Sequence, residues 1–207
     1  MDEPHASAPV WPAFGDLMAC LFGLFVLFFV WSVTFQVDLS EALAAEKEAR
    51  GREQARLHAL ERALAAPLAE GRITLDGSTI GIRGSVLFSL NSAELRPEGA
   101  RLLAELSGPL RAYAEERGGE LLMVSGYTDD LSLGPSAGFR DNWELSAERA
   151  LTVARALIAA GVPSSRIFAA GFGAEHPVAA NETREGRAQN RRVELAFMPR
   201  SAPAKER

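Results

Sequence analysis

The stretch LLMVSGYTDDLSLGPSAGFRDNWELSAERALTVARALIAAGVPSSRIFAA, residues 121–170, contains the signals that decide the fold. Its first five and last four residues are largely apolar and predict two strands. Between them, residues 142–160 have apolar positions at helical spacing, and Asp141 or Asn142 stands where a helix cap is expected. The residues expected on the buried side of this helix are Ala150, Val153, Leu157 and Ile158. A strand, a helix and a second strand in this order are typical of an α/β domain.

Similar signals continue on both sides of this stretch. Residues 73–75 and 79–82 flank Asp76 and Gly77, a good turn pair for a β-hairpin. Residues 86–90 form another short apolar run of the kind found in strands, and residues 193–197 predict the last strand.

A second helix is expected at residues 97–117, where the apolar spacing is again helical and two glycines follow. Its expected buried side chains are Leu102, Leu103, Leu106, Leu110 and Tyr113. We therefore expect an α/β (α+β) sandwich of β-α-β-α-β order, one sheet and one helical layer, over residues 72–198. Residues 199–207 are expected to form a disordered tail.

An apolar segment near the N-terminus predicts a single transmembrane helix. Residues 17–35 carry no charge, and the apolar stretch reaching back to Trp11 exceeds the roughly 20 residues that cross a bilayer. Trp11 and Trp31 would lie about 30 Å apart on a helix, at the two interfaces. We expect a short tail over residues 1–9 and the membrane helix over residues 10–36. A cleaved signal peptide is not expected, because no Lys or Arg precedes the apolar run.

Asp16 is the only charged residue between Val10 and Phe35. A carboxylate at membrane depth is costly to keep ionised, so it predicts a functional site that carries a proton or another small cation. The alternative is that Asp16 caps the start of the helix. Because the span has no second charge, we expect a polytopic partner subunit to complete the ion path. H+ or Na+ would be the translocated ion, and no bound cofactor is expected.

Residues 37–71 are rich in Ala, Glu and Arg and predict a helical connector. Leucines stand at positions 39, 43, 57, 60, 64 and 68. Their spacing is only partly heptad-like and Gly51 interrupts it, so a coiled coil, a solvated single helix and a partly disordered tether remain alternatives. A fully helical connector over residues 38–70 would be about 50 Å long.

The composition argues against several functional classes. The 207-residue chain has 22 basic and 27 acidic residues, a net charge of −5, and no basic block, so no nucleic-acid partner is expected. None of the three histidines has a metal-ligand spacing and no nucleophile with its base is recognisable, so we expect neither a metal nor an enzyme. The one cysteine, Cys20, excludes an intrachain disulfide.

Several motifs recur in order along the C-terminal half. They are Gly126-Tyr127-Thr128-Asp129, Asn142-Trp143-Glu144-Leu145-Ser146-Ala147-Glu148-Arg149-Ala150, Gly171-Phe172-Gly173, Gly186-Arg187 and Asn190-Arg191-Arg192-Val193-Glu194. This series resembles the motifs of OmpA-like peptidoglycan-binding domains. At the N-terminus, Phe14-Gly15-Asp16-Leu17-Met18-Ala19 resembles the membrane motif of MotB-type flagellar stator B subunits, whose periplasmic domain is of the same type.

The resemblance implies a binding site for the peptide stem of peptidoglycan. In the family, the aspartate of G-x-T-D and the arginine of L-S-x-x-R-A hold the ammonium and a carboxylate of diaminopimelate, and these residues are Asp129 and Arg149 here. Asn91, Thr128 and Asn142 are expected to add polar contacts. The alternative is that Asp129 and Arg149 form a structural salt bridge.

Two arginines within these motifs are expected to support the fold, and one aromatic residue is expected to change the polarity of the pocket. Arg191 and Arg192 are expected to be structural, donating hydrogen bonds to loop carbonyls. Tyr127 stands where many family members have histidine, so the polarity of the pocket is expected to differ there.

For the whole chain, the resemblance implies the peptidoglycan-anchored B subunit of an ion-driven motor, with a polytopic MotA-like partner and a homodimeric state. It would be a single-pass protein of the bacterial inner membrane, with a cytoplasmic N-terminus and a periplasmic domain. Lys47, Arg50 and Arg52, which follow the span, favour the opposite orientation by the positive-inside rule.

What the motor drives is left open by the residues. A flagellar stator and a non-flagellar relative, such as the Zorya-type anti-phage system, both fit, and the short connector favours the latter. A passive tether between the inner membrane and the wall is the alternative.

Overall fold

The computed structural model describes residues 10–116, 120–134 and 138–199, without the side chains of residues 10, 12, 13 and 116. The chain divides into two compact units after Gln54. In its described residues the first unit is part of one helix, α1, Val10–Ala63. Of the described helices, α1 alone is long and apolar enough to cross a membrane. Its polar part carries exposed ion pairs one helical turn apart, Glu46 with Arg50 and Glu48 with Arg52, each at 2.6 Å.

The last turns of α1 belong to the second unit. Leu60 and Leu64 are 2% and 1% exposed and lie in the same core as the side chains of the sheet. The compact domain therefore begins near Ala55 and not at residue 72, because these two leucines pack into the core. They are unavailable for a coiled-coil seam. Helix α2, Ala65–Ala69, follows directly.

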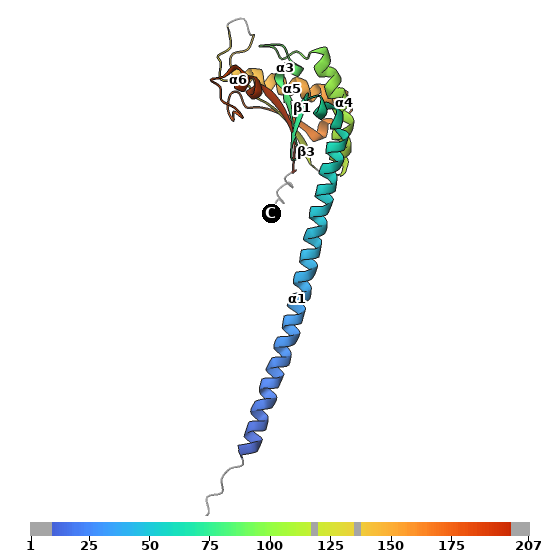
Figure 1. The fold of residues 1–207 in the computed structure, drawn as a ribbon, viewed down its shortest axis with the longest axis vertical. Helices are drawn as coiled ribbons and strands as arrows, with labels where there is room; N and C mark the ends of the chain where they lie inside the picture. The colour runs from blue at the N-terminus through green and yellow to red at the C-terminus, as the bar shows by residue number, and fades with distance from the viewer. Residues whose placement is uncertain (1–9, 117–119, 135–137, 200–207) are drawn as a thin grey trace, which may run out of the picture. The chain divides into compact units, whose positions relative to one another are not determined.

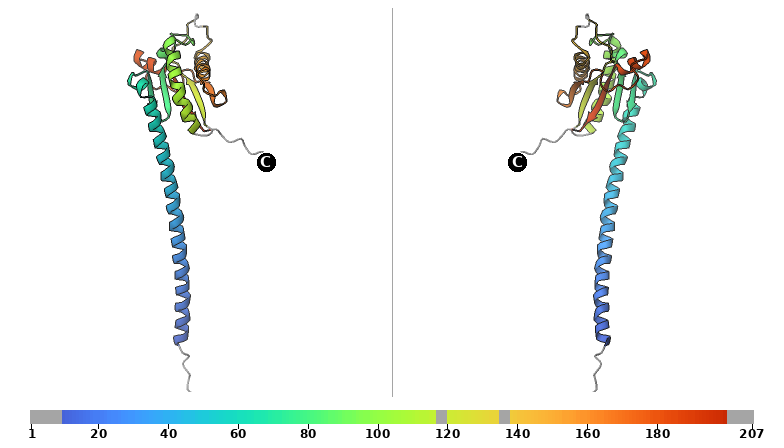
Figure 2. Two further views of the ribbon diagram at one scale, coloured as in Figure 1. Left: turned by 90° about the vertical axis from the view of Figure 1, so that its right-hand side faces the viewer. Right: turned by 90° about the vertical axis from the view of Figure 1, so that its left-hand side faces the viewer.

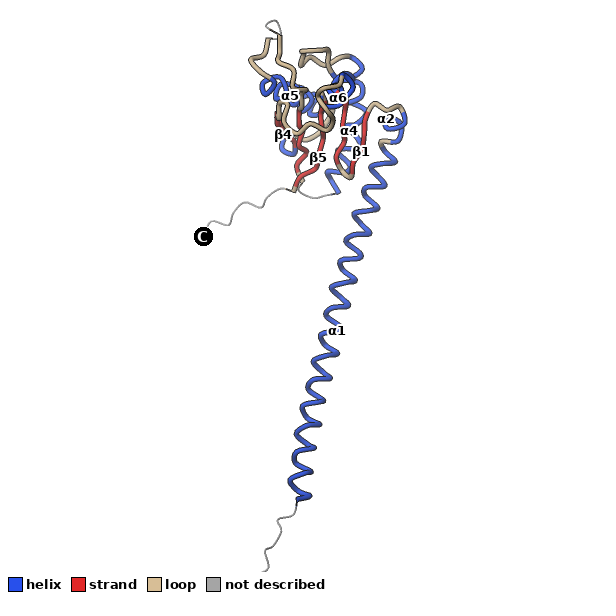
Figure 3. The backbone as a smooth tube through the Cα atoms, turned by 60° about the vertical axis from the view of Figure 1, so that its left-hand side comes forward, coloured by secondary structure: helices blue, strands red, loops and turns tan. Residues whose placement is uncertain are grey.

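A mixed five-stranded sheet is the centre of the second unit (Figures 1 and 3). Its strands are β1 Ile73–Asp76, β2 Thr79–Arg83, β3 Leu121–Gly126, β4 Ile167–Gly171 and β5 Arg192–Met198. They are arranged in the order β1-β2-β5-β3-β4, in which only β3 and β4 are parallel neighbours. The last strand of the chain thus lies between the hairpin and β3, so the segment before β5 lies at the same end of the sheet as the segment after β3.

Helices α4, Pro97–Glu116, and α5, Asn142–Ala159, form the helical layer and lie side by side (Figure 2). All five side chains expected to be buried on α4 are buried. On α5 the expectation holds for Ala150, Val153 and Leu157 and is wrong for Ile158, which is 38% exposed. The predicted α/β sandwich is confirmed.

Two short segments differ from the expectation. The first is the apolar run of residues 86–90, which was expected to be of the kind found in strands. Its first two residues belong to helix α3, Gly84–Leu87, and Phe88 pairs with Leu95 in a single β-bridge. The backbone N–H of Gly84 donates to Arg191 O at 2.7 Å, which turns the chain out of the sheet at the end of β2.

The second is the polar, arginine-rich segment over residues 181–192, which contains a further helix, α6, Arg184–Asn190. Thr183 caps it by accepting a hydrogen bond from Gly186 N at 3.0 Å. A 3-10 turn, Ser164–Arg166, precedes β4.

Leu64→Ala tests whether the junction between α1 and α2 is part of the domain core. We expect it to lower the free energy of unfolding by about 2–5 kcal/mol, as for other leucine truncations in well-packed cores. The measurement is urea denaturation of the full chain in detergent, followed by circular dichroism. Leu90→Ala is the control, because Leu90 is 74% exposed. Equal effects of the two substitutions would place Leu64 outside the core.

Candidate functional site

The five residues expected to bind the peptide stem lie around one cavity of about 360 Å³. Asn91 comes from the loop before α4, Thr128 and Asp129 follow β3, and Asn142 and Arg149 come from α5. The remaining lining residues are Leu90, Leu131, Ser132, Leu133, Leu145, Arg184, Arg187 and Arg191. The lining of this one cavity therefore comes from segments that are up to about a hundred residues apart in the sequence.

Two glycines allow α5 to approach the strands closely at this end of the sheet. Gly126 and Gly171 are register partners at the ends of β3 and β4. A Cβ atom at Gly126 would collide with the backbone oxygen of Ser146, and one at Gly171 would lie 2.6 Å from the backbone nitrogen of Ala147. This close packing explains why the motifs contain glycine at both positions, and it places the loop after β3 beside α5.

A chain of hydrogen bonds connects the motifs to one another. The Oγ of Ser146 accepts a hydrogen bond from Gly173 N and donates one to Trp143 O, both at 2.9 Å. The carbonyl of Gly173 in turn accepts from Thr128 N at 2.8 Å. The serine of the helix motif therefore positions the threonine that precedes Asp129.

Asp141 is the residue that caps α5, since its side chain accepts a hydrogen bond from Glu144 N at 2.8 Å. Asn142 is thus free to line the cavity, and its Nδ2 donates to Asp129 O at 3.2 Å and to Leu131 O at 3.0 Å. The backbone N–H of Arg140 donates to the Glu144 carboxylate and holds the pKa of that group below its usual value. These bonds fix both ends of the loop that follows Asp129.

The carboxylate of Asp129 pairs with Arg191 and not with Arg149. The distance from Arg191 Nη1 to Asp129 Oδ2 is 2.5 Å, and the Asp129 side chain is 11% exposed. Arg191 was expected to be only structural, yet it also lines the cavity. One Asp129 oxygen, Oδ1, remains outside this ion pair.

Arg149 is 4% exposed and is held by backbone carbonyls. Its Nε donates to Ser92 O at 2.9 Å and its Nη2 to Ser89 O at 3.4 Å, while the guanidinium lies 5.3 Å from the ring centre of Phe88. Burial, together with the positive charge of Arg191, lowers the pKa of Arg149 to about 10, and Asp129 acts in the opposite direction. A buried guanidinium without a carboxylate partner among the described residues is suited to bind an anionic ligand group.

Two buried polar atoms of the lining residues complete the site. Thr128 Oγ1 and Asn142 Oδ1 have no hydrogen-bond partner within the described part of the chain. Thr128 is 4% exposed, so its hydroxyl cannot be satisfied by bulk water. Both atoms belong to residues that line the cavity.

Tyr127 does not line this cavity. Its ring lies 3.8 Å from the guanidinium of Arg192 and stacks on Phe172 at 5.2 Å. Burial, followed by the negative charge of Glu194, raises the pKa of the Tyr127 phenol. Arg192 Nη2 donates to the carbonyl of His176 at 3.2 Å, as expected of a structural arginine, and its Nε donates to Glu194 at 2.6 Å. Tyr127 therefore lies outside the cavity lining, and the expected change in pocket polarity at this position is not seen.

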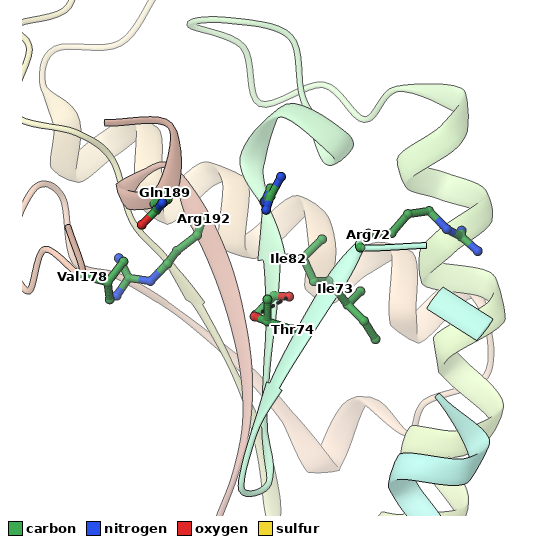
Figure 4. Close-up of a pocket in the computed structure, with 10 residues that line it drawn as sticks. Arg72, Ile73, Thr74, Ile82, Val178, Gln189 and Arg192 are labelled. Atoms are coloured by element: carbon green, nitrogen blue, oxygen red, sulfur yellow. Dashed lines mark hydrogen bonds between the residues drawn. The ribbon is translucent and has the colours of Figure 1, made fainter. Parts of the chain in front are cut away.

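A second cavity, of about 220 Å³, lies near β1 and β2 (Figure 4). Its lining includes Thr74, Val178 and Arg192. The side chain of Arg192 extends toward Val178, whereas Arg72 points away on the other side (Figure 4). Since its polar groups do not converge, this cavity is not a candidate site.

No group of three or more His, Cys, Asp or Glu residues that could hold a metal occurs in the described ranges.

Asp16 lies inside α1. The helix already includes Val10, so Asp16 is past the first turn and its side chain cannot cap the N-terminus. The capping alternative is therefore wrong, and the charge within the apolar stretch needs another explanation.

The sequence of residues 87–191 matches the OmpA family. The chain belongs to the OmpA family. Motility protein B of Bacillus subtilis is 36% identical over 134 residues, which are 64% of this chain and 49% of that protein. The chain spans about half the length of the curated relatives it matches first.

Two solved structures resemble this OmpA-family chain in both fold and sequence. A putative MotB-like protein from Desulfovibrio vulgaris has a TM-score of 0.66 and 31% identity, covering 75% of this chain and 99% of that one. The cell wall anchor of the T6SS from Pseudomonas aeruginosa has a TM-score of 0.59 and 33% identity, covering 66% of this chain and 94% of that one.

Proposed function

We propose that this chain is the B subunit of a membrane-embedded, ion-driven motor and anchors it to peptidoglycan. One observation carries the proposal: a chain of the OmpA family combines a cavity containing Asp129 and Arg149 with an apolar helix that has Asp16 in its interior. The similarity to Motility protein B and to a MotB-like protein supports it.

In the wall site, the ligand is the diaminopimelate residue of the peptide stem. Arg149 binds a carboxylate, because its buried guanidinium donates to carbonyls and pairs with no carboxylate among the described residues. The ammonium lies at Asp129 Oδ1, the oxygen outside the pair with Arg191. Thr128, Asn142 and Asn91 supply the neutral hydrogen bonds. The chain acts by binding and not as an enzyme.

In the membrane, Asp16 alternates between a neutral and an ionised state as its surroundings change within a polytopic MotA-like partner. A buried carboxyl favours its neutral form and a nearby cation or donor favours the charged form, so the cycle couples ion flow to movement. Each charge that crosses supplies about 2.3 kcal/mol per 100 mV. The translocated ion is H+ or Na+, and the motor is flagellar or belongs to a non-flagellar system such as the Zorya type.

This model places the N-terminus in the cytoplasm and the domain in the periplasm, with the span in the inner membrane. Two copies of the chain form the anchored unit. The wall provides the fixed point against which the motor exerts force.

A passive tether is the second candidate function, favoured by the similarity to a protein described as a cell wall anchor. A tether needs the wall site and the membrane helix but no ion carrier. The two candidates therefore differ in what Asp16 does.

Co-sedimentation with purified peptidoglycan sacculi tests the wall site. We expect the full chain, in detergent, to pellet with sacculi from a diaminopimelate-containing bacterium and to be released by excess free diaminopimelate. Lysine at the same concentration should not release it, because lysine lacks the carboxylate on its ε-carbon. Failure to pellet, or equal release by lysine, would contradict the proposal.

A further inference from the structure

The charges around the cavity do not balance. Its lining contains four arginines, at positions 149, 184, 187 and 191, and in the described residues one carboxylate, that of Asp129. The ion pair with Arg191 already neutralises Asp129. The lining residues therefore carry a net positive charge, which favours a ligand with negative charge.

The three remaining arginines differ in how the protein holds them. Arg149 donates to the carbonyls of Ser92 and Ser89, and Arg187 donates to the carbonyl of Asn181 at 2.6 Å. Arg184, at the first position of α6, is exposed and makes no hydrogen bond or ion pair with any described residue. Of the lining cations, Arg184 is the one left unpartnered within the described part of the chain.

The cavity thus has anion-binding groups on two separate elements, Arg149 on α5 and Arg184 on α6. A peptide stem carries more than one carboxylate: one on the diaminopimelate side chain, one on the α-carbon of the γ-linked glutamate before it, and one at its C-terminus. Thr128, whose buried hydroxyl is unpartnered among the described residues, also lines this cavity.

We propose that Arg184 is a specificity-determining residue that binds a second carboxylate of the stem, next to the one at Arg149. The proposal rests on the wall-binding function proposed above. It makes the site selective for stems whose carboxylates are free over stems in which the second one is amidated. Because Arg184 is exposed, its contribution is that of a rim ion pair, about three- to fivefold in affinity, and it weakens as salt rises.

Calorimetric titration of the full chain in detergent with three synthetic tetrapeptide stems tests this assignment. One stem has all carboxylates free, one has the glutamate α-carboxylate as an amide, and one has the C-terminus as an amide. We expect the wild type to bind the free acid about three- to fivefold more tightly than one of the two amides. Arg184→Gln should abolish that difference, and the affected amide identifies the carboxylate.

Arg101→Gln is the matched control, because Arg101 is an exposed arginine on α4 that does not line the cavity. It makes the same charge change and should bind all three stems as the wild type does. The assignment is overturned if Arg184→Gln binds like the wild type, or if it weakens all three stems equally. Failure of the proposed function would look different, since the wild type would then bind none of the stems.

Discussion

Asp16→Asn should abolish the ion-driven activity of the complex while leaving membrane insertion and wall binding unchanged. Asparagine has nearly the shape of aspartate and can hydrogen-bond, but it cannot take up and release a proton or pair with a cation. Asp16 lies in the interior of α1, so the substitution removes no helix cap. The expected loss is complete, because the stretch from Val10 to Phe35 has no second charge to replace it.

The measurement is complementation of a deletion strain in the native host, scored by the phenotype of that deletion. Protein level in the membrane and co-sedimentation with sacculi are measured in parallel. Asp38→Asn is the control, because Asp38 is the first carboxylate after the apolar stretch of the same helix. If Asp16→Asn complements fully, the ion-carrier role is excluded and the passive tether is the better description.

Arg149→Ala should reduce the affinity for stem peptides by about 10- to 100-fold, the loss expected when charge-assisted hydrogen bonds to a ligand carboxylate are removed. Arg149→Lys should also lose at least about tenfold, because an ammonium cannot donate to a loop carbonyl and a ligand carboxylate with the geometry of a guanidinium fork. Asp129→Asn should weaken binding through loss of the ammonium contact, and it also leaves Arg191 without its ion pair.

Affinities come from calorimetric titration of the full chain, and thermal unfolding shows whether each variant is folded. Arg149 also supports the loop through Ser89 and Ser92, so the lysine variant separates ligand binding from folding. Arg155→Lys is the matched control on the same helix, since Arg155 is exposed and pairs with Glu148 outside the cavity. Wild-type affinity of a folded Arg149→Ala variant would contradict the wall site.

Most of the helices and strands could be predicted because their apolar residues repeat with the period of the element. The spacing along residues 97–117 identified the buried face of α4, and the Asp76 and Gly77 turn identified the hairpin. Residues 84–87 could not be predicted in this way. Four residues are too short for a period, and their conformation depends on the hydrogen bond between Gly84 and Arg191, two residues far apart in the sequence.

The start of the domain shows a second limit of periodicity. Leu60 and Leu64 have the spacing of a helix with one apolar face, but spacing does not say which surface that face contacts. A neighbouring copy of the helix and the core of the same chain would require the same pattern. Only the fold shows that both leucines are buried in the core of the domain.

For the candidate site, too, some features could be predicted from the sequence and others only from the fold. The sequence by itself determined the apolar helical segment with its single charge and the α/β class. Through its resemblance to the family, it also gave the five residues Asn91, Thr128, Asp129, Asn142 and Arg149 that line the cavity. Only the tertiary structure decided that Asp129 pairs with Arg191, 62 positions away, and that Arg184 lines the cavity without a hydrogen bond or ion pair to a described residue. The reason is the antiparallel pairing of β3 and β5, which places the residue that follows one strand beside the residue that precedes the other.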